Sequence, residues 1–265
     1  MNIDLTGKTA IVTGSTDGIG LAIATGLAQA GASVIITGRT QSRLDDALEK
    51  IHAAAANAPE VLGVLANIGT AEGCQTLIAA QPQADILINA LGIYGGKEFF
   101  DITDADWEEI YQVNVLSGIR LSRHYAQGMK EKGWGRIQFI SSESALNIPA
   151  EMVHYGVSKA ALQGVSRGLA KVLAGTGVTV NTVLPGPTRT TGAINMMKKM
   201  ADERGVSALE MESIFLKENR PSTLLNRFAN PEEVANMSVY IASEQASATT
   251  GAALRVEGGI VESIA

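Results

Sequence analysis

A tyrosine and a lysine lie four residues apart in the stretch HYGVSKAAL, as Tyr155 and Lys159. On a helix this spacing places both side chains on one face, one turn apart. A phenol has an ordinary pKa of about 10, and a nearby ammonium group favours its ionised form. The spacing therefore predicts that Lys159 lowers the pKa of Tyr155 and makes the phenol a useful proton donor or acceptor. An ordinary surface pair has the same spacing and contributes little to stability. The neighbouring residues must therefore distinguish a surface pair from a catalytic one.

Two other polar residues supply that context. Ser142 comes just after the β-branched run Arg136–Ile140, and open α/β sheets bind their ligands at the carboxyl ends of strands. We predict that Ser142 bonds the oxygen that Tyr155 protonates, although a serine after a strand also often caps a turn. Asn114 lies among apolar residues of an expected helix, an unfavourable place for asparagine. Either it is a hydrogen-bonded core residue, or it distorts the helix and holds a water in a proton path to Lys159.

A glycine cluster, TGSTDGIG, joins the first apolar run to a helical pattern at Thr13–Gly20. Its three glycines suit a tight turn, a close approach of the backbone to a pyrophosphate, and close packing of helix on strand. The start of the helix would present free N–H groups and a positive dipole end to the phosphates. We predict a dinucleotide site here, rather than a purely structural turn. Its contacts are expected from Gly14, Ser15, Thr16, Asp17, Gly18, Ile19 and Gly20.

The choice between NAD and NADP is usually made at the end of the second strand, where a carboxylate would bond the ribose 2′-hydroxyl. The sequence there is Thr37-Gly38-Arg39-Thr40, with no carboxylate. The planar guanidinium of Arg39 suits a 2′-phosphate, unless Arg39 is simply a solvated loop residue. Asp17 argues the other way, because a basic residue just before Gly18 would favour the phosphate. The balance gives NADP a narrow preference over NAD.

These residues must be positioned by the elements around them, and short β-branched runs alternate with longer helical patterns along the chain. The expected strands are Thr9–Thr13, Ser33–Thr37, Val61–Leu65, Ile86–Asn89, Arg136–Ile140, Thr179–Leu184 and a short one near Ala253–Val256. The expected helices lie near Gly18–Ala30, Ser42–Ala55, Thr70–Ala80, Asp104–Met129, Tyr155–Leu173 and Pro231–Ala242. Such alternation predicts an α/β fold of the Rossmann type, a doubly wound parallel sheet of about seven strands with helices on both faces.

One segment, Thr190–Phe228, breaks this alternation because it is long and helical with no strand inside it. It holds Met196, Met197, Met200 and Met211, half of the eight methionines in the chain. Such methionines are typical of core or interface packing, and they also suit a mobile lid over an apolar substrate pocket. No linker, repeat or low-complexity tract divides the sequence. We therefore expect a single domain over residues 1–265, with a helical substrate lid at about 190–228.

Composition and charge argue against several classes of protein. The chain has 265 residues, 46% hydrophobic and 18% charged, which is typical of a globular domain. A formal net charge of −6 argues against nucleic acid or an anionic membrane as the main partner. No apolar run is long enough to span a bilayer, and the start, MNIDLTGKTAIVTG, does not resemble a signal peptide. A lone Cys74 and three scattered histidines predict a cytoplasmic location, no disulfide framework and no bound metal.

Taken together, these motifs resemble the short-chain dehydrogenase/reductase family over nearly the whole chain, and its 3-oxoacyl-ACP reductase-like members in particular. The resemblance is carried by TGSTDGIG, by Asn114 and Ser142, and by the Tyr155-x-x-x-Lys159 pair. Further motifs of the family are resembled by the run Pro185-Gly186-Pro187-Thr188-Arg189-Thr190 and, near the end, by Thr250-Gly251 and Gly258-Gly259.

The resemblance implies a carbonyl–alcohol oxidoreductase with Asn114, Ser142, Tyr155 and Lys159 at the catalytic positions. By the same analogy, Lys159 also bonds the nicotinamide ribose and Thr190 holds the carboxamide. The resemblance further implies cofactor contacts from Asn67, Ile68, Asn89, Ala90, Gly92, Tyr155, Lys159, Pro185, Gly186, Thr188 and Thr190.

The sequence departs from the family's pattern in three places. The family's Asn-Asn-Ala-Gly turn appears here as Asn89-Ala90-Leu91-Gly92, so one side-chain bond is lost. Asn67 stands where an aspartate usually contacts adenine, which keeps an acceptor and drops a charge. Glu257 replaces a common aspartate near the end. None of these changes removes a catalytic group, so we still expect activity.

The leading prediction is an NAD(P)-dependent oxidoreductase that interconverts a carbonyl and an alcohol, with Tyr155 as general acid or base. The alternative is a non-catalytic dinucleotide-binding protein that senses redox state or scaffolds partners, and a complete catalytic set argues against it. Chain length and glycine spacing disfavour a sugar-nucleotide epimerase or dehydratase. Family members often form homo-oligomers, so a dimer or tetramer is expected. Ala161, Val165 and Leu169 suit either subunit contact or packing on the sheet.

The substrate is expected to be a small molecule, and little in the sequence identifies it. Tyr94, Glu143, His154 and the methionine-rich segment are candidates to line its pocket because they lie near the motifs. Glu143 either accepts a hydrogen bond from a substrate hydroxyl, as in a polyol or sugar, or faces water. His154, at the start of its helix, is expected to face solvent.

Overall fold

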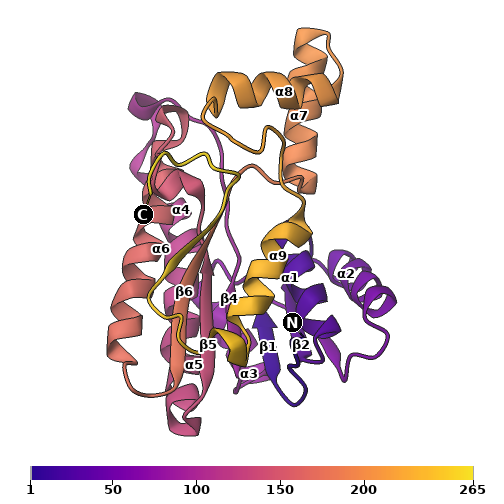
Figure 1. The fold of residues 1–265 in the computed structure, drawn as a ribbon, viewed down its shortest axis with the longest axis vertical. Helices are drawn as coiled ribbons and strands as arrows, with labels where there is room; N and C mark the ends of the chain where they lie inside the picture. Colours follow the sequence, from indigo (N-terminus) through magenta and orange to yellow (C-terminus); the bar gives the residue numbers. More distant parts are fainter. Residues whose placement is uncertain (1, 265) are drawn as a thin grey trace.

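The computed structural model describes residues 2–264, within which seven strands form a parallel sheet in the order β3-β2-β1-β4-β5-β6-β7 (Figure 1). The strands are β1 (Thr9–Val12), β2 (Ser33–Gly38), β3 (Val61–Leu65), β4 (Ile86–Asn89), β5 (Gly135–Ile140), β6 (Val178–Pro185) and β7 (Ala253–Val256). The α-helices are α1 (Gly18–Gln29), α2 (Gln41–Ala54), α3 (Ala71–Ala80), α4 (Asp104–Tyr111), α5 (Ser117–Lys132), α6 (Val153–Val172), α7 (Thr191–Arg204), α8 (Ala208–Asn219) and α9 (Pro231–Ile241). The predicted Rossmann-type fold is confirmed.

The order of the strands reverses between β1 and β4. β1 pairs with β2 on one side and with β4 on the other, so Val12 lies beside both Ile36 and Ile88. The chain winds outward in one direction from β1 to β3 and in the other direction from β4 to β7. At such a reversal the loops after the two central strands part, which leaves a crevice at the carboxyl ends of the strands.

Alternation along the strands divides the main core into two layers. On β1, Ala10 and Val12 belong to one apolar cluster and Ile11 to the other. The first cluster takes its helical residues from α1, α2 and α9, and the second takes them from α3, α5 and α6. Successive side chains of a strand point to opposite faces of the sheet, so the two clusters lie on opposite faces. Helices therefore cover both faces of the sheet. The edge strand β3 differs from this expectation, because its Leu62 and Leu65 are exposed.

The predicted helix Asp104–Met129 is divided into α4 and α5 by a π-helical turn at Gln112–Leu116. Asn114 lies in this wider turn and is 2% exposed. Turns of this kind are frequent at functional sites, because they redirect one side chain without ending the helix. The predicted distortion at Asn114 is therefore present, and so is the predicted burial.

Helices α7 and α8 stand beyond the carboxyl ends of the strands (Figure 1). They have a small core of their own, which we call the α7–α8 core: Met197, Ala201, Met211, Leu216 and Phe228. The methionines of this segment serve both predicted roles. Met197 and Met211 belong to this core, Met196 lines a cavity, and Met200 lines the cavity and also packs against the core. No helix within residues 2–264 combines the length and the apolar character needed to cross a membrane.

Candidate active site

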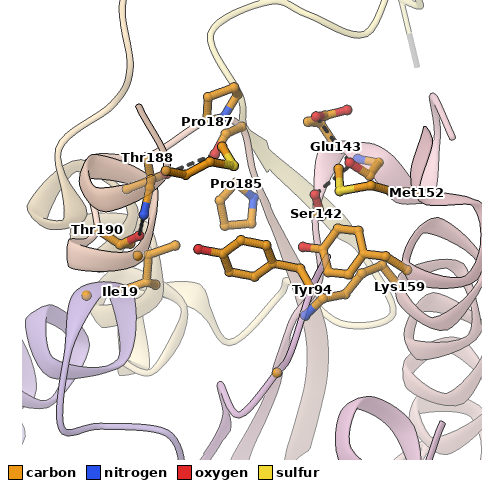
Figure 2. Close-up of a pocket in the computed structure, with 18 of the residues that line it drawn as sticks. Ile19, Tyr94, Ser142, Glu143, Met152, Lys159, Pro185, Pro187, Thr188 and Thr190 are labelled. Carbon is orange, nitrogen blue, oxygen red and sulfur yellow. Dashed lines mark hydrogen bonds between the residues drawn. The ribbon is translucent and has the colours of Figure 1, made fainter. Parts of the chain in front are cut away.

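A cavity of about 580 Å³ lies between the glycine loop, the ends of β4, β5 and β6, and helices α7 and α8 (Figure 2). Its lining includes these predicted residues: Gly14, Asp17, Gly18, Ile19, Gly20, Ala90, Gly92, Ser142, Tyr155, Lys159, Pro185, Gly186, Thr188 and Thr190. The predicted residues outside its lining are Ser15, Thr16, Arg39, Asn67, Ile68, Asn89 and Asn114. Figure 2 shows Ser142 and Glu143 on one wall, with Ile19 and Thr190 across from them.

Tyr155 and Ser142 meet in this cavity. Ser142 caps the short turn after β5, where its Oγ accepts a hydrogen bond from Ser144 N at 3.1 Å. Burial raises the pKa of Tyr155 to about 12, and a hydrogen bond with the Ser142 hydroxyl offsets part of this rise. The prediction that the pKa of Tyr155 is lowered is therefore wrong. Loss of hydration disfavours the phenolate more than the neighbouring groups favour it.

Lys159 is buried one helical turn after Tyr155 on α6. Its Nζ donates a hydrogen bond to Ile140 O at 2.8 Å and lies 5.7 Å from the centroid of the Tyr155 ring. Burial lowers the pKa of Lys159 to about 8. A Cβ on Gly92 would lie 3.2 Å from this Nζ, so the glycine leaves space open beside the ammonium group.

We expect Lys159→Met to stabilise the protein against urea at pH 7. A pKa lowered from 10.5 to about 8 means that the folded state resists the charge, at a cost of about 3 kcal/mol. Loss of the hydrogen bond to Ile140 offsets about 1 kcal/mol of the gain. The unfolded chain binds the extra proton between pH 8 and 10.5, so the advantage of the variant should shrink as pH rises through that window. An advantage independent of pH would contradict the assigned pKa.

Asn114 is held by three hydrogen bonds. Its Oδ1 accepts from Ile93 N at 2.7 Å, and its Nδ2 donates to Ile93 O at 3.0 Å and to Ser158 Oγ at 3.0 Å. Both amide hydrogens are therefore used, and Oδ1 keeps one lone pair for a further partner such as a water. The side chain fixes the backbone of Ile93, between the cavity-lining residues Gly92 and Tyr94.

The glycine loop between β1 and α1 depends on close backbone contacts. A Cβ on Gly20 would lie 2.2 Å from Gly14 O, and a Cβ on Gly14 would lie 2.9 Å from Leu91 Cα. The first residues of α1, Gly18, Ile19 and Gly20, line the cavity. The start of a helix carries N–H groups without an intrahelical partner, so this wall of the cavity offers donors to an anion.

Asp17 is the N-cap of α1 and joins the glycine loop to the start of α7. Its Oδ1 accepts hydrogen bonds from Gly18 N at 2.7 Å and from Thr191 Oγ1 at 2.8 Å. Thr190, the N-cap of α7, lies against the same loop, because a Cβ on Gly18 would be 2.8 Å from its Cγ2. The loop and the helical segment 190–228 are therefore in direct contact.

Ser15 and Thr16 hold the glycine loop in place from behind. The buried Ser15 Oγ donates to Val12 O at 2.6 Å and accepts from Thr37 N at 2.9 Å, which ties the loop to β2. Thr16 packs on the end of β2, where a Cβ on Gly38 would lie 2.8 Å from its Cγ2. Both side chains therefore support the loop, and neither reaches the cavity.

The loop after β4 is held by side chains of its neighbours. Thr13 Oγ1 accepts hydrogen bonds from Ala90 N at 3.1 Å and from Leu91 N at 3.2 Å. Asn89 is buried, and its Nδ2 donates to Ser122 Oγ at 3.3 Å and to Gln138 O at 3.2 Å. The side chain of Asn89 thus braces the loop, while Ala90 and Gly92 line the cavity.

Arg39, Asn67 and Ile68 follow β2 and β3, to the side of the cavity. Arg39 and Asn67 are exposed, whereas the Ile68 side chain is buried in the second apolar cluster. Asn67 Oδ1 accepts a hydrogen bond from Gly69 N at 3.2 Å and shapes the turn after β3. Ile68 can therefore meet a ligand only through its backbone.

The loop after β6 forms another wall. Pro185 ends β6, and a Cβ on Gly186 would lie 2.8 Å from Glu257 O, so the chain passes close to the segment after β7. Thr188 Oγ1 donates to Gly186 O at 2.9 Å. This wall is therefore fixed by contacts within the loop and with the C-terminal segment.

Arg220 is a cavity residue that the sequence did not reveal. It ends α8, and its Nε donates to Glu143 Oε1 at 2.8 Å, with both side chains buried. The interpretation of Glu143 as a residue facing water is therefore wrong. These residues are 77 positions apart, and no local pattern links them.

The prediction that His154 faces solvent is also wrong. The side chain is buried, and its ring packs edge-on against Trp107 of α4 with centroids 6.1 Å apart. Trp107 lies on a separate helix, so the position of His154 at the start of α6 did not predict that its side chain is buried. Its place in the structure is therefore in the packing between α4 and α6.

A doubly wound sheet, a glycine loop opening into a helix and a tyrosine–lysine pair on one cavity define a nucleotide-dependent oxidoreductase. A family model described as Enoyl-(Acyl carrier protein) reductase matches residues 14–261. The chain belongs to the short-chain dehydrogenase/reductase family. It is an oxidoreductase that interconverts a carbonyl and an alcohol with a nicotinamide cofactor.

Relatives of known sequence or structure support the same assignment. The chain is 44% identical to the uncharacterized oxidoreductase YvaG of Bacillus subtilis over 267 aligned residues, covering 100% of both chains. It is 36% identical to the 3-oxoacyl-[acyl-carrier-protein] reductase FabG of Aquifex aeolicus, covering 98% of this chain and 100% of the relative. The crystal structure of L-sorbose reductase from Gluconobacter frateurii, complexed with NADPH and L-sorbose, matches with a TM-score of 0.93 at 30% identity, covering 100% of both chains.

Proposed function

We propose that this chain is an NADP(H)-preferring reductase of ketones or aldehydes, with Tyr155 as the general acid or base. One observation carries the proposal: Tyr155, Ser142 and Lys159 converge on the same cavity into which the glycine loop opens. A protein that only bound a dinucleotide would need the loop and not this convergence. The catalytic set is Ser142, Tyr155 and Lys159, with Asn114 as a residue that positions the loop containing Ile93.

In the reducing direction, Tyr155 donates its proton to the carbonyl oxygen and Ser142 donates a hydrogen bond to the same oxygen. A pKa of about 12 keeps the phenol protonated at neutral pH, ready to donate. Lys159, charged below about pH 8, stabilises the phenolate that remains after the transfer. A bound nicotinamide ring supplies the hydride for the carbonyl carbon.

The residues present fit a dinucleotide. Glycine is required at Gly14 and Gly20 by backbone contacts, and the N–H groups at the start of α1 suit a pyrophosphate. The open space beside Lys159 Nζ at Gly92 suits a ribose hydroxyl. We assign the nicotinamide end to the walls formed by Ala90, Pro185, Gly186, Thr188 and Thr190. We assign the adenosine end to Arg39, Asn67 and the backbone of Ile68.

We expect Arg39 to discriminate between the two cofactors. It is exposed and directly follows Gly38, which packs on Thr16 of the glycine loop, so its guanidinium is free to reach a 2′-phosphate beside that loop. Arg39→Ala should weaken NADPH binding by about 10- to 100-fold, the value of a charged hydrogen bond, and leave NADH binding unchanged. The dissociation constants by titration of protein fluorescence test this.

Lys50→Ala is the matched control for Arg39→Ala, because it removes an exposed positive charge from the far end of α2. It should leave the ratio of the two dissociation constants unchanged. Tighter binding of NADH than of NADPH by the unaltered chain would contradict the NADP preference. An unchanged ratio of the NADPH and NADH dissociation constants in Arg39→Ala would show that Arg39 does not bind the 2′-phosphate.

The proposed function is tested by the absorbance of the reduced nicotinamide ring during incubation with candidate substrates. The panel contains simple ketones and aldehydes, ketoses, hydroxysteroids and acyl thioesters, each with NADPH and with NADH. We expect turnover of at least one carbonyl class, faster with NADPH. Tight cofactor binding with no turnover across the panel would support a binding protein that lacks catalysis.

We also propose a homo-oligomer working in the cytoplasm, as one domain with a lid at residues 190–228. The single cysteine, Cys74, is a buried thiol, in keeping with a reducing compartment. Ala161, Val165 and Leu169 are partly buried against the second apolar cluster, so each keeps surface that a second subunit could cover. The exposed Val172 of α6 and Tyr111 of α4 are further candidates for subunit contact. Light scattering of the purified protein measures the oligomeric mass.

A further inference from the structure

A buried ion pair lies on the cavity wall next to Ser142. Glu143 follows Ser142 in the chain, and Figure 2 shows it on the same wall. Its Oε1 accepts hydrogen bonds from Arg220 Nε at 2.8 Å and from Ser144 Oγ at 3.2 Å. The side chains of Glu143 and Arg220 are 4% and 7% exposed, so the pair is almost wholly removed from solvent.

The second carboxylate oxygen of Glu143 has no partner. Its Oε2 is buried and receives no hydrogen bond from any residue in the described range 2–264. A buried acceptor left unpaired costs free energy, and more so when it carries charge. Glu143 lines the cavity, and the terminal torsion of a glutamate is soft, so a small rotation turns Oε2 toward a bound molecule. A donor on a ligand would complete the set of hydrogen bonds.

The charges around this oxygen favour a neutral donor over an anion. Glu151 Oε1 lies 3.8 Å from Arg220 Nη1, so two carboxylates share one guanidinium. Arg220 Nη1 also donates to Asn219 O at 2.7 Å. An anionic substrate group would meet the excess negative charge and compete for an arginine already engaged. A hydroxyl group carries no charge and donates one hydrogen bond, and one donor is what Oε2 of Glu143 lacks.

The ion pair lies close to the reacting groups. The charge of Glu143 raises the pKa of Tyr155 and the charge of Arg220 lowers it, although burial of the phenol is the larger cause of its shift. Ser142, which directly precedes Glu143, forms a hydrogen bond with the same phenol. A substrate whose carbonyl oxygen lies between Tyr155 and Ser142 would therefore place its neighbouring carbons near Glu143.

We propose that Glu143 accepts a hydrogen bond from a substrate hydroxyl near the reacting carbonyl, and that the site thereby selects uncharged hydroxylated ketones, such as ketoses, over plain ketones. This inference rests on the proposed function and narrows its substrate class. A site built to bond a hydroxyl rejects the analogue that lacks it, because the buried polar group is then left unpaired. A purely structural pair that anchors α8 to the turn after β5 is the alternative.

The test compares two six-carbon ketones with the carbonyl at the same position. One is L-sorbose, and the other is 2-hexanone, which has the same carbon chain and no hydroxyl group. We expect kcat/KM with NADPH to be at least about 100-fold higher for L-sorbose. Glu143→Gln keeps the size of the side chain and places an amide where the carboxylate was. It should lower kcat/KM for L-sorbose about 10- to 100-fold more than it lowers kcat/KM for 2-hexanone.

Glu210→Gln is the matched control, because it removes an exposed carboxylate of α8 that does not line the cavity. It should change kcat/KM for each ketone by no more than about threefold, as expected for an exposed charge. A third substrate, 1-hydroxy-2-hexanone, carries one hydroxyl next to the carbonyl. We expect it to recover part of the preference in the unaltered enzyme and none of it in Glu143→Gln.

Several outcomes would overturn the inference. Equal losses on L-sorbose and 2-hexanone in Glu143→Gln, with a lower melting temperature, would assign the pair to anchoring. Equal kcat/KM for L-sorbose and 2-hexanone in the unaltered enzyme would show that the site does not select hydroxylated ketones. A preference for 2-oxohexanoate that disappears in Arg220→Gln would show that this wall binds a substrate carboxylate through Arg220 instead. Failure to reduce any carbonyl compound with either cofactor would overturn the proposed function itself, and this inference with it.

Discussion

Tyr155→Phe is expected to lower kcat by about 100- to 10,000-fold on any carbonyl substrate that the enzyme accepts. The substitution removes one oxygen from the cavity wall and keeps the ring that packs edge-on against Tyr94, with centroids 6.2 Å apart. Without the phenol, the carbonyl oxygen loses the proton donor that is proposed to act on it together with Ser142. The loop that is proposed to bind the pyrophosphate is untouched, so the dissociation constant of NADPH should stay within a few-fold.

Stopped-flow measurement of the first turnover separates this effect from slow product release. Tyr240→Phe serves as the control, since it removes a phenol oxygen from a half-buried tyrosine of α9 that does not line the cavity. That variant should turn over substrate like the unaltered enzyme. Hydride transfer in Tyr155→Phe at more than about a tenth of the normal rate would show that another group supplies the proton.

Gly20→Ala is expected to impair both cofactor binding and stability. The new methyl group would lie 2.2 Å from Gly14 O, 2.9 Å from Gly14 C and 3.1 Å from Ser15 Cα, all of them backbone atoms. The glycine loop must therefore move, and overpacking of this kind costs about 1 to 3 kcal/mol, occasionally more. In a chain of this size that corresponds to a fall in melting temperature of roughly 2 to 12 °C. Displacement of the loop should weaken NADPH binding by about 100-fold.

Gly128→Ala is the control for this steric effect. Gly128 lies within α5, and a Cβ there would have no atom within 4 Å. Because alanine is the better helix former, this variant should be as stable as the original or more stable by up to about 1 kcal/mol. Differential scanning calorimetry with and without NADPH measures both variants. Normal NADPH binding by Gly20→Ala would show that the loop does not need its observed shape.

The framework of the site was predictable because the strands of a parallel sheet end on the same side. Runs such as Thr9–Val12 and Ile86–Asn89 are strongly apolar, and the residues just after them had to gather at one edge. The glycines of the first loop predicted a close backbone contact, and Gly20 makes it with Gly14. The position of Ser142 on the cavity follows from this rule, because Ser142 comes two residues after the end of β5.

Other features depended on burial and on distant contacts, which spacing does not contain. The i, i+4 relation of Tyr155 and Lys159 gave their proximity, but the direction of the tyrosine pKa shift depends on how deeply the phenol is buried. The division of one long helix at Gln112–Leu116 follows from the bonds between Asn114 and Ile93, 21 residues earlier. The pairing of Glu143 with Arg220 arises only once α8 is packed over the turn after β5.

The α7–α8 core is separate from the two apolar clusters that cover the sheet. Met197, Ala201, Met211, Leu216 and Phe228 pack with one another and belong to neither cluster that covers the sheet. Mutations that alter distant, independent contacts have nearly additive effects on stability. Substitutions within the α7–α8 core are therefore expected to change stability independently of substitutions in the two clusters that cover the sheet. Thr191 and Arg220 still tie this segment to the glycine loop and to the turn after β5, so a change of substrate range by substitution in α7 and α8 must keep these two contacts.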